Sequence, residues 1–98
     1  MSSKEQLYYL LINYYRENYD TRSFCEQFVL IYSDGIDNYV DSTEMTMMND
    51  FCKLAERYSP YDEDLNLSKF FLDATQFRIN FDELWMRYNL SNTINSPE

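Results

Sequence analysis

The sequence has a single glycine, Gly35, among its 98 residues. Sandwiches and barrels need many tight turns, and turns depend on glycine because it adopts positive φ angles without strain. We therefore predict an all-α fold. The length allows one compact domain with a core of its own. We expect an antiparallel four-helix bundle with short extra turns in its loops over residues 1–90, and a frayed polar tail over residues 91–98.

Apolar residues recur at helical intervals in four segments. The predicted helices cover residues 3–19, 20–34, 42–58 and 73–88. The first begins at Ser3, which has capping-box spacing to Gln6, and the last begins near Asp73 in the same way. Gly35 is expected to end the second helix in the left-handed region, and Pro60 to end the third. The apolar stripes are predicted to contain Leu7, Leu10, Leu11, Tyr14, Tyr15, Phe24, Phe28, Ile31, Tyr32, Met47, Met48, Phe51, Leu54, Ala55, Tyr58, Phe77, Phe81, Leu84, Trp85 and Tyr88.

The connections follow from the same spacing. We expect two or three residues between the first two helices, which makes them antiparallel neighbours. Residues 61–67 are predicted to form a loop or a short turn. Phe70 and Phe71 are predicted to form a lead-in turn that packs under the bundle.

The charge balance excludes several functions. The chain carries 17 acidic and 8 basic residues and no histidine, a net charge of −9. This charge disfavours binding to nucleic-acid phosphates and to anionic membranes. The apolar stretch at residues 7–12 is too short to span a bilayer. Cys25 and Cys52 are expected to be buried, reduced thiols of a cytoplasmic protein.

The sequence contains little that indicates catalysis or metal binding. Without histidine, the commonest general base and zinc ligand is missing, although nucleophiles paired with lysine remain open. Neither acidic loop has the ligand pattern of an EF-hand. Asp82 and Glu83 are adjacent, so they point in different directions on a helix. We predict a protein that is not an enzyme and has no metal site and no cofactor.

The negative charge is concentrated in the middle of the chain. Residues 34–64 carry nine acids and two bases, a net charge of −7, whereas the flanking thirds are each close to neutral. One acidic cluster is Asp34, Asp37, Asp41 and Glu44, and the other is Asp62, Glu63 and Asp64, with Glu56 nearby. A solvated surface that keeps the protein soluble is one interpretation. A single-sign field this localised also favours a basic partner.

Tyrosine is the second signal. The chain has ten tyrosines, most of them on or beside the apolar stripes, where a core or core-rim position is expected. Tyr39 and Tyr61 fall instead in predicted loops, each inside an acidic cluster. Carboxylates pair with guanidinium groups, and aromatic rings receive cations on their faces. This combination is typical of a surface that binds an Arg- and Lys-rich partner.

The run Glu56-Arg57-Tyr58-Ser59-Pro60-Tyr61, preceded by Phe51 and Ala55, resembles the colicin D-type immunity proteins, which include immunity proteins of contact-dependent growth inhibition systems. Phe24 with Glu26, and a final helix entered through Asp73, are similar as well. The resemblance covers about residues 7–90. It implies a helical bundle that binds and blocks a tRNA-cleaving toxin domain, with acids that stand in for tRNA phosphates.

The resemblance also implies which residues face the toxin. Glu56 matches directly, whereas Ser59 and Tyr61 occupy positions that are acidic in the colicin D relative, so that the following acids would substitute. The toxin-binding residues expected from the resemblance, the acidic clusters and the loop tyrosines are Glu56, Tyr58, Tyr61, Asp62, Glu63, Asp64, Asp37, Tyr39, Asp41 and Glu44. The alternatives are an acidic DNA mimic that blocks a DNA-binding or restriction protein, and a helical adaptor.

Overall fold

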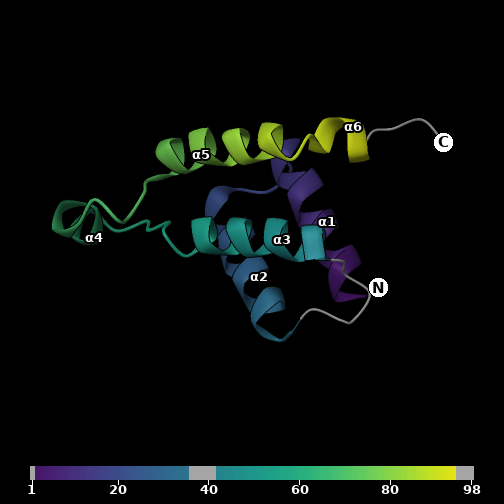
Figure 1. The fold of residues 1–98 in the computed structure, drawn as a ribbon. Helices are drawn as coiled ribbons and strands as arrows, with labels where there is room; N and C mark the ends of the chain where they lie inside the picture. Colours follow the sequence, from purple (N-terminus) through teal and green to yellow (C-terminus); the bar gives the residue numbers. More distant parts are fainter. Residues whose placement is uncertain (1, 36–41, 95–98) are drawn as a thin grey trace.

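A computed structural model of the chain describes residues 2–35 and 42–94, and these residues form helices and no strand (Figure 1). The helices are α1 (Ser3–Tyr15), α2 (Thr21–Ser33), α3 (Ser42–Ala55), α4 (Asp62–Leu67), α5 (Ala74–Arg87) and α6 (Leu90–Ile94). The four main helices, α1, α2, α3 and α5, pack together, so the predicted all-α bundle is confirmed. In Figure 1, α3 and α5 run in opposite directions, α1 and α2 pass steeply across them, and α4 lies apart.

Side-chain caps start the helices. Asp20 caps α2 by accepting a hydrogen bond of 2.7 Å from the Ser23 backbone. Asp73 and Gln76 form the predicted capping box of α5. The α1 box lies one residue earlier than predicted: Ser2 is the cap and Glu5 its partner.

The ends of α1 and α3 differ from the prediction, and α3 ends at Ala55 and not at residue 58. α1 ends at Tyr15 and not Tyr19, because Glu17 adopts a φ of 63° and the Asn18 amide bonds back to Asn13, which closes a Schellman turn. Five residues then join α1 to α2, more than the two or three expected. Gly35 has a φ of 98°, the left-handed conformation predicted for it.

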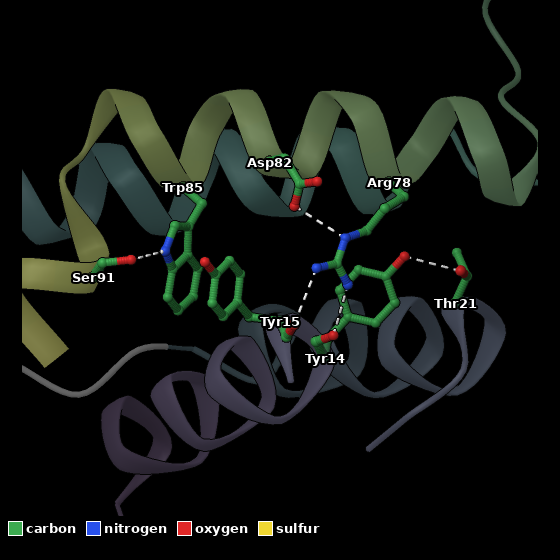
Figure 2. A network of polar contacts seen from close by, with 7 residues as sticks. All are labelled: Tyr14, Tyr15, Thr21, Arg78, Asp82, Trp85 and Ser91. Atoms are coloured by element: carbon green, nitrogen blue, oxygen red, sulfur yellow. Dashed lines mark hydrogen bonds and ion pairs between the residues drawn. The ribbon is translucent and has the colours of Figure 1, made fainter. Parts of the chain in front are cut away.

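The C-terminal region is also more ordered than expected. Asn89, with a φ of 53°, ends α5, and the chain forms α6 instead of continuing as a tail. Leu90 is buried, and Ser91 accepts a hydrogen bond of 2.7 Å from the Trp85 indole (Figure 2). These two contacts hold α6 against α5. Residues 95–98 of the predicted tail lie outside the described residues.

The core is aromatic. Its buried members are fifteen of the twenty residues predicted from the apolar stripes, together with Cys25, Cys52, Leu72 and Leu90. The other five stripe residues are only half-buried against this core: Tyr15, Ile31, Tyr32, Tyr58 and Tyr88. Phe24, Phe51 and Phe81 are fully buried and bring α2, α3 and α5 into ring contact. Tyr14 brings α1 into the same aromatic cluster, because its ring stacks on that of Phe24 at 4.7 Å between centroids. Among the described residues, no helix has the length and apolar composition needed to cross a membrane.

Arg78 fastens the end of α1 to α5 (Figure 2). Its guanidinium donates to the Tyr14 and Tyr15 carbonyls at 2.9 and 3.0 Å, and its Nε pairs with Asp82 at 3.0 Å. The group also lies over the rings of Tyr14, Tyr15 and Phe81. The last carbonyls of a helix have no partner within the helix. The Tyr14 carbonyl also accepts from the Glu17 amide at 3.0 Å, so Arg78 adds a second donor to Tyr14 and supplies a donor to Tyr15.

We expect Arg78→Met to lower the free energy of unfolding by about 2–4 kcal/mol, because each of two part-buried carbonyls loses its charged donor. Arg22→Met is the matched control. Arg22 pairs with Glu26 at the same i,i+4 spacing and the same 3.0 Å, but on an exposed surface, where solvent screens the pair and its loss should change stability far less. Urea unfolding followed by circular dichroism measures both. Equal losses would show that the two carbonyl bonds contribute nothing.

Candidate protein-binding surface

The chain between α3 and α5 leaves the bundle and returns to it. The Ser59 amide donates to the Leu72 carbonyl at 3.0 Å, and the Leu72 amide donates to the Arg57 carbonyl at 2.7 Å. This bridge closes the base of the excursion, and α4 lies at its tip (Figure 1). Phe70 is exposed here, with the Arg57 guanidinium over its ring, so the prediction that it packs under the bundle is wrong.

A buried serine attaches α4 to this base. Ser59 is only 3% exposed, and its hydroxyl donates to Asp64 at 2.7 Å. The same oxygen accepts a hydrogen bond from the Tyr61 amide. Asp64 therefore has a structural role: it holds the first turn of α4 in place. Within residues 61–67, predicted as a loop or short turn, Asp62–Leu67 form a helix of six residues.

The remaining α4 acids are free to meet a partner. Asp62 and Glu63 are exposed and form no ion pair with any residue that the structure describes. They follow Tyr61, whose side chain is 58% exposed. Glu56 is exposed near the end of α3, within 4.0 Å of the Cys52 sulfur. An exposed ring beside uncompensated carboxylates is the combination that the sequence suggested.

Next to these acids lies an open groove of about 460 Å³. One wall is a face of α2, and the other is the end of α3 with the chain that follows it. The lining residues are Arg22, Cys25, Glu26, Val29, Leu30, Ser33, Ala55, Tyr58, Pro60 and Tyr61. Most of this lining is apolar, and Leu30 is 57% exposed in it. The surface thus combines an apolar groove with exposed acidic residues beside it.

Acids also outnumber bases around the groove. Arg22 is the base in the lining, and it is paired with Glu26. The lining residues Ser33, Ala55 and Tyr61 are each followed directly in the chain by an exposed acid: Asp34, Glu56 and Asp62. A basic partner seated in the groove would therefore meet carboxylates at its edges.

Not every sequence-predicted residue belongs to this surface. Glu56, Tyr58, Tyr61, Asp62 and Glu63 lie in or beside the groove. Glu44 instead joins α3 to α1, because its carboxylate accepts from the Tyr8 hydroxyl at 2.7 Å and pairs with Lys4 at 3.1 Å. Asp37, Tyr39 and Asp41 lie outside the described residues.

Burial favours the neutral forms of both cysteines and of a tyrosine that lines the groove. Burial raises the pKa of the Cys25 thiol far above its ordinary value, that of Cys52 to about 11, and that of the Tyr58 hydroxyl as well. These groups are neutral near pH 7, so they offer no activated nucleophile. In the part of the chain that the structure describes, no three acidic, cysteine or histidine side chains converge on a metal position.

Sequence reasoning missed the α2 side of the groove. The spacing of the second helix places Val29 beside the buried face and gives no position to Leu30, which lies outside the stripe formed by Phe24, Phe28 and Ile31. That misfit was the available signal. Comparisons of the chain with known protein families, curated proteins and solved structures find no match.

Proposed function

We propose that the protein is an immunity protein, which binds and neutralises the nuclease domain of a cognate bacterial toxin. The domain in question is basic and is expected to cleave tRNA. The inhibitor covers its RNA-binding surface with carboxylates and tyrosine rings, and performs no chemistry itself. The resemblance of residues 56–61 to colicin D-type immunity proteins suggests this class.

The observation that carries the proposal is the projecting α4, whose Asp62 and Glu63 form no ion pair with any described residue and lie beside the exposed Tyr61. Charges that serve only the fold are usually paired or cap a helix, as Glu44 and Asp20 are here. Asp62 and Glu63 cap no main helix, and repel one another. A basic partner removes that repulsion and accelerates its own association through the same field.

The test uses the full chain and the toxin domain encoded beside its gene. We expect the two proteins to co-purify as a complex and tRNA to survive incubation with the toxin when the inhibitor is present. The absence of both a complex and protection would refute the proposal. Recovery of a DNA-binding or restriction protein from bacterial lysate, with no effect on the toxin, would favour the DNA-mimic alternative.

A further inference from the structure

The groove beside α4 has the dimensions of a helix-binding site. Its α2 wall presents residues 22, 25, 26, 29, 30 and 33, which recur at the three- and four-residue spacing of one helix face. At 1.5 Å per residue, this wall is about 16 Å long, which corresponds to about three turns of a bound helix. Amphipathic helices dock into such grooves through apolar side chains spaced one turn apart.

The opposite wall cannot take an extended partner strand. Strand addition requires free backbone amides along an edge. Here the Tyr58 amide donates to the Ala55 carbonyl, the Ser59 amide to Leu72, and the Tyr61 amide to the Ser59 hydroxyl. Pro60 has no amide hydrogen to offer. A partner must therefore bind this groove through its side chains, which favours a helix over a strand.

Charge then decides which helix fits. The apolar surface of Val29, Leu30 and Tyr61 needs apolar side chains opposite it, and the acids that border it need basic ones. A second copy of this chain would bring another net charge of −9 to the same place. We propose that the groove binds a cationic amphipathic helix of the partner, with one apolar stripe flanked by lysine or arginine. This inference rests on the proposed function, because it names the part of the toxin domain that docks here.

The experiment uses three fourteen-residue peptides and the full chain labelled with ¹⁵N. The first peptide carries leucines one helical turn apart and lysines at the flanks; the second has the same composition in scrambled order; the third replaces lysine with glutamate. We expect the first to bind at least tenfold more tightly than either control. Its amide shift changes should centre on Leu30 and Tyr61. Equal binding of the scrambled peptide, or shifts centred elsewhere, would overturn the inference.

Two variants localise the effect. Leu30→Asp removes an apolar contact from the groove and sets a carboxylate against the leucines of the first peptide, so it should weaken binding at least tenfold although the added charge alone would attract the lysines. Leu67→Asp makes the same change at a residue of α4 that is 81% exposed and does not line the groove, and should leave binding unchanged. Equal behaviour of the two variants would contradict the proposed site. Sedimentation that shows a dimer broken by Leu30→Asp would place a second copy in the groove instead.

Failure of this inference differs from failure of the proposed function. If the chain protects tRNA from the toxin and Leu30→Asp protects it equally well, the immunity function stands and the helix site is wrong. If the cationic peptide binds as expected but the toxin is neither bound nor inhibited, the groove stands and the immunity function is wrong.

Discussion

Phe81→Ala is expected to lower the free energy of unfolding by about 3–5 kcal/mol, a large part of the stability of a domain this size. Phe81 is fully buried. The centroid of its ring lies 4.8 Å from that of Tyr14, 5.3 Å from that of Phe51 and 5.5 Å from that of Phe24. One side chain therefore joins rings from α1, α2 and α3 to α5. Truncation leaves a cavity that four helices border, and rigid aromatic neighbours refill it poorly.

Ile79→Ala provides the matched control on the same helix. Ile79 is 56% exposed, so its truncation should change stability by no more than about 0.5 kcal/mol. Urea unfolding followed by circular dichroism gives both values. A loss below about 1 kcal/mol for Phe81→Ala would show that the aromatic core does not depend on this ring.

The core could be predicted because apolar residues spaced three and four apart lie on one face of a helix, and that face is the one that is buried. Phe77, Phe81 and Trp85 recur at intervals of four residues, and all three are buried. Helix ends were harder to predict. Glu17 and Asn89 adopt the left-handed conformation that the sequence suggested only for glycine. As a result, α1 ends before the predicted residue, and α6, which was not predicted, follows α5. Backbone hydrogen bonds decide these ends, and periodicity does not report them.

The candidate site was predictable in its charge but not in its shape. The sequence placed Tyr61 among acids, and the structure leaves that ring exposed. The sequence alone could not show that Asp64 is bound to Ser59, or that Glu44 is bound to Lys4, because these contacts depend on how separate segments meet. The α2 wall of the groove was missed for the same reason: a groove belongs to two elements, and Leu30 contributes only one side of it.

These internal roles determine which acids should be altered to test toxin binding. Reversal of Asp64 would break its bond to Ser59 and confuse folding with binding. Asp62 and Glu63 make no such contact within the described residues, so their replacement tests the surface alone. Glu17 and Glu83 are the matched control pair, since both are exposed and equally without an ion pair in that part of the chain.

We expect Asp62→Lys with Glu63→Lys to weaken toxin binding by about 10²–10³-fold, because carboxylates that pair with desolvated toxin bases become repulsive. Asp62→Asn with Glu63→Gln should lose less, as it removes attraction without adding repulsion. Glu17→Lys with Glu83→Lys changes the net charge equally and should lose less than tenfold. Surface plasmon resonance at 50 and 300 mM salt measures all three, with the largest differences at low salt. If the two reversed pairs lose affinity equally, overall charge and not the α4 surface governs binding.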